Sequence, residues 1–149
     1  YLPREPGDIV SIDGRRLGRH EGLMYYTLGQ RQGLGIGGTR EGDGTPWFVA
    51  EKQMDLNRLV VVQGHTHSRL LSHSVEAADA SWTSGEPPST DMQIAAKTRY
   101  RQSDAACTLQ SVKGGEFSLA FECAQWAVTP GQSAVLYAGD VCLGGGIIR

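Results

Sequence analysis

Short runs of alternating or β-branched apolar residues recur along the whole chain, and turn residues separate them. Such runs are typical of β-strands. The predicted strands cover residues 8–12, 15–20, 47–50, 59–62, 75–82, 92–100, 107–112, 116–121, 133–137 and 141–148. Residues 23–28 fit a strand or a short helical turn, because periodicity does not separate the two at this length. No stretch has the pattern of a long amphipathic helix, so the sequence predicts a mainly β fold.

Turn signals join these runs into hairpins and divide the chain in two. Asp13-Gly14 and Gly114-Gly115 each link two predicted strands, as hairpin loops do. From His73 the strand pattern restarts, and strands recur about every 8–12 residues, as in sandwiches and barrels. We therefore expect a small β-rich domain over residues 1–72, followed by an antiparallel β-barrel over residues 73–149.

Composition narrows the class of protein without assigning a function. The 149 residues carry a net charge of −2, so any contact with nucleic acid must come from a local patch. No apolar run reaches the roughly 18 residues of a membrane span, and no signal peptide is visible. The chain begins at Tyr1 without a methionine, which suggests an excised fragment or a processed chain.

The chain has three cysteines, and none of them forms a C-x-x-C motif. Their odd number argues against a disulfide framework or a zinc knuckle. Cys107, Cys123 and Cys142 each stand in an apolar, strand-like setting, where a free cysteine packs as a small hydrophobe; a reactive thiol is the alternative. Reduced thiols fit a cytoplasmic protein.

A glycine-rich segment covers residues 22–38, and its last six residues spell G-x-G-x-x-G. In dinucleotide-binding proteins a helix opens directly after this motif, and its N-terminus binds the pyrophosphate. Here two further glycines and Pro46 follow, so no useful helix can start. A phosphate loop is excluded as well, because no Gly-Lys-Ser/Thr follows. The segment is therefore expected to form tightly turned backbone.

Positive charge gathers in one short block. Lys97, Arg99 and Arg101 occupy alternate positions, so a strand would place all three on one face. Thr98 and Tyr100 would lie on the other face. A polyanion would relieve the repulsion among the cations, and the Tyr100 ring could stack on a base or sugar. A solvated edge strand protected by its charge explains the same pattern.

The evidence for a metal site, a second phosphate-binding strand or a catalytic site is weaker. His65 and His67 form an H-x-H pair with His73 nearby, which could bind a metal, but no local carboxylate or cysteine completes such a site. The basic strand at residues 15–20 is either a solvated face or a phosphate-facing edge. The residues show no Ser/His/Asp set and no paired carboxylates in apolar surroundings. A β-rich binding module is therefore favoured over an enzyme.

Four blocks of sequence are characteristic when taken in order. They are residues 22–38 (GLMYYTLGQRQGLGIGG), 97–102 (KTRYRQ), 127–137 (AVTPGQSAVLY) and 142–148 (CLGGGII). Together they resemble the C-terminal part of the tRNA-specific 2-thiouridylase (MnmA) family, and the resemblance extends over essentially the whole chain. Full-length members have an N-terminal ATP-pyrophosphatase domain, a small central domain and a C-terminal β-barrel. The resemblance therefore makes residues 1–72 the central domain and residues 73–149 the barrel.

The resemblance implies a part in tRNA modification. The full-length enzyme is a transferase that uses ATP, with Mg, to adenylate C2 of the wobble uridine, and then replaces that oxygen with sulfur from a persulfide cysteine. Its ATP-binding loop and nucleophilic cysteine belong to the N-terminal domain, and its persulfide cysteine belongs to a segment just before Tyr1. We therefore expect no catalytic residue, cofactor or metal in this chain, and neither ATP hydrolysis nor tRNA thiolation by it alone.

The resemblance also implies which residues touch tRNA. In the family these are the Arg-Tyr pair of the K-x-R-Y-R block and the glutamine of T-P-G-Q. Here they fall on Arg99, Tyr100 and Gln132. Arg99 would contact phosphate, Tyr100 a ribose or base, and Gln132 would hydrogen-bond sugar or backbone.

Further residues are weaker candidates for facing tRNA. They are Lys97, Arg101 and Arg31. Tyr25, Tyr26 and Arg31 either line a wall between the catalytic domain and the tRNA or pack against the glycine-rich segment, and packing is the favoured interpretation.

The expected partners follow from the same resemblance. They are tRNA, through its anticodon region, and a sulfur-relay protein or cysteine desulfurase for the full-length enzyme. A cytoplasmic monomer without membrane contact is expected. The alternative is a β-barrel that mainly docks a protein, such as a sulfur-relay partner.

Overall fold

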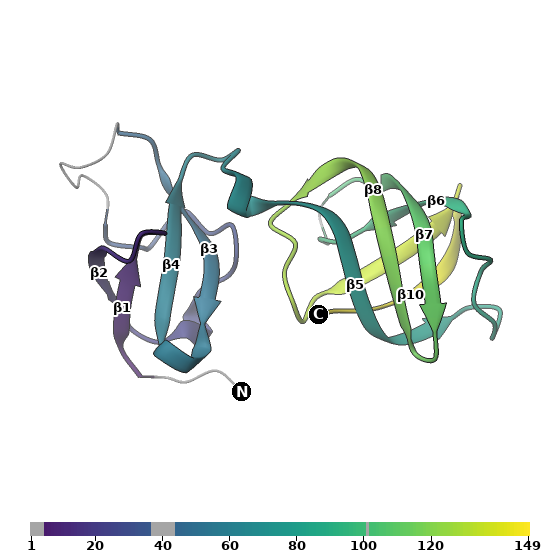
Figure 1. Cartoon of the computed structure of the whole chain (residues 1–149), viewed down its shortest axis with the longest axis horizontal. Helices are drawn as coiled ribbons and strands as arrows, with labels where there is room; N and C mark the ends of the chain where they lie inside the picture. Colours follow the sequence, from purple (N-terminus) through teal and green to yellow (C-terminus); the bar gives the residue numbers. More distant parts are fainter. Residues whose placement is uncertain (1–4, 37–43, 101) are drawn as a thin grey trace. The chain divides into compact units, whose positions relative to one another are not determined.

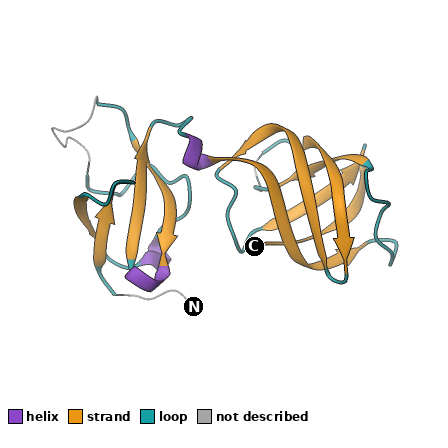
Figure 2. Cartoon of the chain, in the orientation of Figure 1, coloured by secondary structure: helices purple, strands orange, loops and turns teal. Residues whose placement is uncertain are grey.

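The computed structural model describes residues 5–36, 44–100 and 102–149. The chain divides into two compact units, Tyr1–Leu70 and Leu71–Arg149. Strands and three short 3-10 helices make up the regular structure of the described ranges, which contain no α-helix (Figure 2). The prediction of a mainly β fold is thus confirmed. None of the helices described is long and apolar enough to cross a membrane.

Four described strands of the first unit form one mixed sheet (Figure 1). They are β1 (Gly7–Val10), β2 (Arg16–His20), β3 (Trp47–Gln53) and β4 (Arg58–Gln63), in the order β2-β1-β4-β3. Neighbours β1 and β2 are antiparallel, as are β3 and β4, whereas β1 and β4 run parallel. The predicted Asp13-Gly14 turn joins β1 to β2, and Gly14 has a φ of 87°, which glycine adopts without a steric penalty.

Short 3-10 helices connect several of the strands. They cover Leu23–Tyr25, Met54–Leu56 and Ser68–Leu70. The first shows that the ambiguous run at residues 23–28 begins as a helical turn. The second ends at Asn57, whose left-handed φ of 51° turns the chain into β4.

The glycine-rich segment completes the core of the first unit. Its residues Leu23, Leu34 and Ile36 are buried together with strand residues of the sheet. The Gly29 N–H donates to the Val49 carbonyl at 2.7 Å, and the Val49 N–H donates to the Gln30 carbonyl at 2.9 Å. The segment is therefore tied to β3 by backbone bonds. Residues 37–43, which hold the end of this segment and most of the predicted loop at 39–46, lie outside the described ranges.

The second unit is a closed antiparallel barrel of six described strands, as predicted (Figure 1). The strands are β5 (Leu71–Trp82), β6 (Gln93–Lys97), β7 (Ala105–Lys113), β8 (Glu116–Trp126), β9 (Ser133–Ala138) and β10 (Val141–Ile148). Their order around the barrel is β10-β5-β8-β7-β6-β9. Each pair of neighbouring strands described in the barrel is antiparallel, and the Gly114-Gly115 turn joins β7 to β8 as expected.

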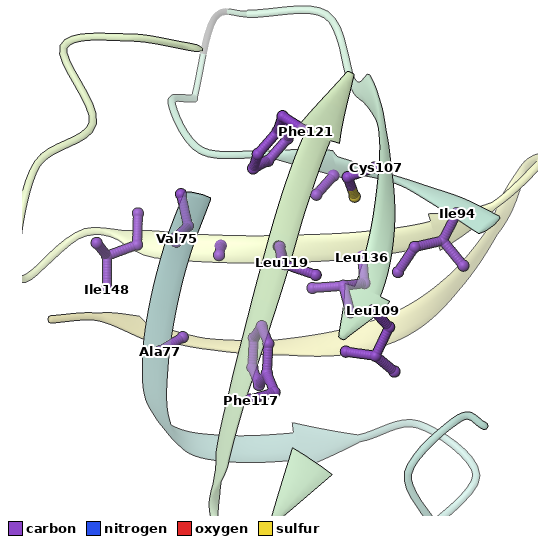
Figure 3. Close-up of a cluster of buried hydrophobic side chains, with 12 residues drawn as sticks. Val75, Ala77, Ile94, Cys107, Leu109, Phe117, Leu119, Phe121, Leu136 and Ile148 are labelled. Atoms are coloured by element: carbon purple, nitrogen blue, oxygen red, sulfur yellow. The ribbon is translucent and has the colours of Figure 1, made fainter. Parts of the chain in front are cut away.

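Alternating residues of these strands fill the barrel interior (Figure 3). Leu109, Leu119 and Leu136 have no exposed surface. In β10, residues Gly144 to Gly146 allow the strand to approach its neighbours closely. A Cβ atom at Gly145 would lie 2.3 Å from the Ala134 carbonyl oxygen, so closure of the barrel depends on glycine there.

The cysteines require a correction. Cys107 packs in the barrel core as predicted, and its burial raises the pKa of the thiol to about 11. Cys123 and Cys142 are exposed, so the prediction that they pack as small hydrophobes is wrong. Regular pairing of β8 with β5 is interrupted between Ala120 and Gln125, which places Cys123 outside the inward alternation of that strand.

Candidate nucleic-acid interface

The basic block leaves the barrel earlier than the sequence predicted. Strand β6 ends at Lys97, and the Gln102 N–H donates to the Arg99 carbonyl at 3.2 Å, so the chain turns directly after the strand. Thr98 is 1% exposed and Tyr100 is 90% exposed. The prediction that Thr98 and Tyr100 share one face of a strand is therefore wrong, and so is the prediction of a strand face of alternating cations.

An open groove of about 530 Å³ lies at the end of β6 and is called the basic groove below. It is lined by Lys97, Arg99, Tyr100, Gly131, Gln132, Ser133, Val135 and Tyr137. Two of these described lining side chains are cationic and none is acidic. The lining thus carries cationic side chains and no carboxylate, which favours an anionic partner.

Arg99 is held from two sides by one short segment. Its guanidinium carbon lies 5.4 Å from the centre of the Trp126 ring, within the range of a cation–π contact. Its Nη1 donates to the Ala127 carbonyl at 3.0 Å. The side chain is half-buried, so it forms part of the wall of the groove rather than extending freely from it.

The other lining groups offer different chemistry. Gln132 ends a turn in which its N–H donates to the Thr129 carbonyl at 3.2 Å, and Gly131 has a φ of 91°. This is the residue pattern of a type II turn with Pro130 at its second position. The ammonium of Lys97 lies 6.0 Å from the centre of the Tyr137 ring. Tyr100 presents an exposed ring beside these groups.

The structure thus brings Lys97, Arg99, Tyr100 and Gln132 to one groove, although Gln132 is distant from the others in sequence. Arg31 belongs to the first unit, where it lines a cavity of about 390 Å³. Arg101 lies outside the described ranges.

Tyr25 and Tyr26 differ from one another. Tyr26 packs against the core of the first unit, and its ring makes an edge contact with buried His20, with the centroids 6.0 Å apart. The Tyr25 side chain is 61% exposed. Tyr25 and Gln30 line a second cavity of the same unit, of about 440 Å³. Packing is therefore confirmed for Tyr26, whereas Tyr25 lies outside the core and its role stays a prediction.

Sequence reasoning missed two aromatic residues: Tyr137, which lines the groove, and Trp126, which contacts Arg99. Both lie in strands and read as ordinary barrel residues. The nearest signal was the Trp-Ala-Val-Thr-Pro-Gly-Gln run, which links Trp126 to Gln132. Nothing local in that run indicates that Trp126 meets Arg99, because the contact depends on how the barrel closes.

The histidines do not meet as a cluster. His65 makes an edge contact with the Phe48 ring, with the centroids 5.7 Å apart, and the Nδ1 atom of His67 accepts the Arg69 N–H at 3.1 Å. His73 is an exposed residue of β5. Among the described residues, no group of three His, Cys, Asp or Glu side chains could hold a metal ion.

The described part of the glycine-rich segment is partly buried. Of the residues in its G-x-G-x-x-G motif, Leu34 and Ile36 are buried in the core of the first unit. A nucleotide phosphate is usually received by the N-terminus of an α-helix, and the described ranges contain no α-helix. The described part of the motif thus contributes to packing.

A small mixed sheet followed by a closed barrel with a cation-lined groove defines a β-rich, two-unit chain. Residues 1–63 match the family model described as the tRNA methyl transferase PRC-barrel domain. Residues 72–148 match the model described as the Aminomethyltransferase beta-barrel domain. The chain belongs to the tRNA-specific 2-thiouridylase (MnmA) family, of which it carries the central PRC-barrel and C-terminal β-barrel domains. The resemblance drawn from the four sequence blocks is thus confirmed.

Three curated relatives are each named tRNA-specific 2-thiouridylase MnmA. The protein of Cupriavidus necator is 60% identical over 149 residues, which cover 100% of this chain and 41% of the relative. The protein of Ralstonia nicotianae is 59% identical over 148 residues, covering 99% and 40%. The protein of Acidovorax ebreus is 61% identical over 155 residues, covering 99% and 42%. The chain thus spans about two fifths of the length of the curated relatives it matches.

Proposed function

We propose that this chain is the tRNA-binding region of a tRNA-uridine 2-sulfurtransferase, and that the basic groove is its contact surface. The relatives' shared name supports tRNA as the partner. The observation that carries the proposal is the convergence of Arg99, Tyr100 and Gln132 on one groove that also contains Lys97. Cations, an exposed ring and an amide are the groups that contact phosphate, base and sugar in RNA complexes.

Each side chain has a role that its surroundings support. Lys97 and Arg99 supply positive charge for phosphates of the RNA backbone. Tyr100, at 90% exposure, can stack on a base or ribose without first leaving a packed position. Gln132 stands on a turn and can hydrogen-bond a sugar or a phosphate oxygen.

For the whole protein we propose the chemistry that its relatives' name describes. In this proposal, ATP activates C2 of the wobble uridine, and a persulfide sulfur replaces the oxygen, within the part of the relatives that this chain does not span. The tRNA binds through its anticodon region, and a sulfur-relay protein or cysteine desulfurase supplies the sulfur. The protein works as a monomer in the cytoplasm.

An ATP hydrolysis assay tests the proposal that this chain supplies tRNA binding but no catalysis. The purified chain should not turn over ATP in the presence of Mg and tRNA, because the glycine-rich segment is part of a packed core. A phosphate-release assay with the full-length protein as positive control measures this. Clear ATP turnover by the chain itself would refute the proposal that it supplies only tRNA binding.

A salt titration of tRNA binding tests the groove. Binding should weaken steeply as salt rises, and Arg99→Ala should lower the slope of log K against log salt by about one contact. Arg149→Ala is the matched control, because it removes the same charge from a residue of the same unit that does not line the basic groove. Its slope should match that of the unaltered chain.

The alternative function, a barrel that mainly docks a sulfur-relay protein, predicts the opposite result. Partner binding would then be largely indifferent to Arg99. Weak tRNA binding that neither responds to salt nor distinguishes Arg99→Ala from Arg149→Ala would favour this alternative.

A further inference from the structure

Neighbouring groups of the barrel hold the Arg99 side chain in one position. An arginine that follows the end of a strand has many rotamers, and immobilising it on binding costs conformational entropy. Here the guanidinium lies 5.4 Å from the Trp126 ring centre, and Nη1 donates to the Ala127 carbonyl at 3.0 Å. Both partners belong to adjacent residues at the end of β8, where pairing of Leu71 with Trp126 anchors the backbone.

Ala127 has an unusual backbone for its residue type. It is 2% exposed and has a φ of 52°, in the left-handed region that non-glycine residues rarely adopt. Its carbonyl also accepts a hydrogen bond from the Thr129 hydroxyl at 2.8 Å. Strained backbone of this kind persists where the surrounding structure holds it. The carbonyl that orients Arg99 is therefore fixed in its direction.

We infer that Trp126 is a positioning residue for RNA binding, acting through Arg99 together with the Ala127 carbonyl. This inference rests on the proposed function of the basic groove. The Trp126 ring and the carbonyl hold the guanidinium beside Lys97 and Gln132 before RNA arrives, so less conformational freedom is lost on binding. The ring leaves the charge of Arg99 in place, so it contributes to affinity without adding an ionic contact.

Loss of the Trp126 ring should lower the affinity for tRNA without changing its salt dependence, whereas loss of the Arg99 charge should change both. Trp126→Leu should weaken tRNA binding about 3- to 10-fold, the scale of one cation–π contact, while the slope of log K against log salt stays unchanged. Trp126→Phe should restore most of the affinity, because a ring remains. In an Arg99→Ala background, Trp126→Leu should have no further effect.

Two variants separate positioning from damage to the barrel. Trp82→Leu removes another tryptophan of the barrel, which contacts the Phe117 ring and does not line the groove, and it should leave binding unchanged at a temperature where the chain is folded. Arg99→Lys keeps the charge but loses the planar group that stacks, so it should weaken binding without changing the slope. Arg99→Lys tests the same contact if Trp126→Leu does not fold.

The binding measurements on these variants can overturn the positioning role of Trp126. Equal binding by Trp126→Leu and the unaltered chain, or additive losses in the double variant, would overturn the positioning role and leave the groove intact as a binding surface. Full affinity in Arg99→Lys would overturn it as well. Absence of salt-sensitive, Arg99-dependent binding by the unaltered chain would refute the proposed function and this inference together.

Discussion

The two units complete their cores in different ways. All twelve buried residues of the described barrel core lie in strands. The described core of the first unit has seven buried residues, and three of them, Leu23, Leu34 and Ile36, come from the glycine-rich segment outside the strands. A barrel closes on itself through backbone pairing. An open sheet needs another part of the chain to cover its apolar face.

Glycine therefore has a different structural role in each unit. In β10 it allows backbones to approach closely, as at Gly145, where a Cβ would meet the Ala134 carbonyl. In the glycine-rich segment it allows turns, as at Gly33 and Gly35, whose φ values are 78° and 67°. The most recognisable motif of the sequence thus serves packing, whereas the groove forms at the end of a strand on the rigid barrel. Functional groups often occupy such connections, because the scaffold holds them in place.

Substituting Gly145 should have the largest effect. Gly145→Ala places a Cβ 2.3 Å from the Ala134 carbonyl oxygen, so β9 and β10 must separate, and we expect the free energy of unfolding to fall by about 3 kcal/mol. Chemical denaturation measures the loss, and amide hydrogen exchange assigns it to the barrel. In the control Gly139→Ala, no atom lies within 4 Å of the new Cβ, so only backbone strain of about 1 kcal/mol remains. Equal losses in the two variants would contradict closure by close backbone approach.

Shortening Ile36 tests the cover of the first unit. Ile36→Ala removes a buried side chain that packs over Gly18 of β2, and we expect a loss of about 2 kcal/mol in the free energy of unfolding. Hydrogen exchange should increase in β1 and β2. The control Ile12→Ala alters a residue that is 49% exposed and should change stability by less than about 0.5 kcal/mol. If Ile36→Ala behaved like Ile12→Ala, the segment would not be part of the core.

The smallest effect concerns Cys107 and alkaline pH. Burial raises the pKa of its thiol from the ordinary 9.0 to about 11, so the folded chain keeps a proton that the unfolded chain releases near pH 9. The resulting stability is fully present below about pH 9 and is lost as the pH rises towards 11. The stability difference between the unaltered chain and Cys107→Ala should shrink over this range. A difference that stays constant from pH 8 to about 11 would argue against a buried thiol.

Thiol labelling offers a companion measurement. At mildly alkaline pH, exposed Cys123 and Cys142 should react with a thiol reagent in the folded chain, whereas Cys107 should react only on unfolding. Rapid reaction of all three thiols without denaturant would show that the barrel core is open to solvent.

Much of the fold was predictable, because strands and hairpins depend on local patterns. Period-two alternation, Asp13-Gly14 and Gly114-Gly115 act over a few residues, and the structure contains the predicted hairpins. The parallel pairing of β1 with β4 was not predictable, since it joins segments about 50 residues apart. Exposure of Cys123 was missed for a similar reason, because it follows from an irregular pairing between β8 and β5.

The sequence by itself determined the β class of this chain, its turns and its family, because these depend on short patterns and ordered blocks. Through the family resemblance it also predicted that Arg99, Tyr100 and Gln132 contact tRNA. Only the tertiary structure decided that β6 ends at Lys97 and that Arg99 meets Trp126 and Ala127. The end of a strand and the partner of a long side chain depend on what distant segments place beside them, and a local pattern carries no information about that.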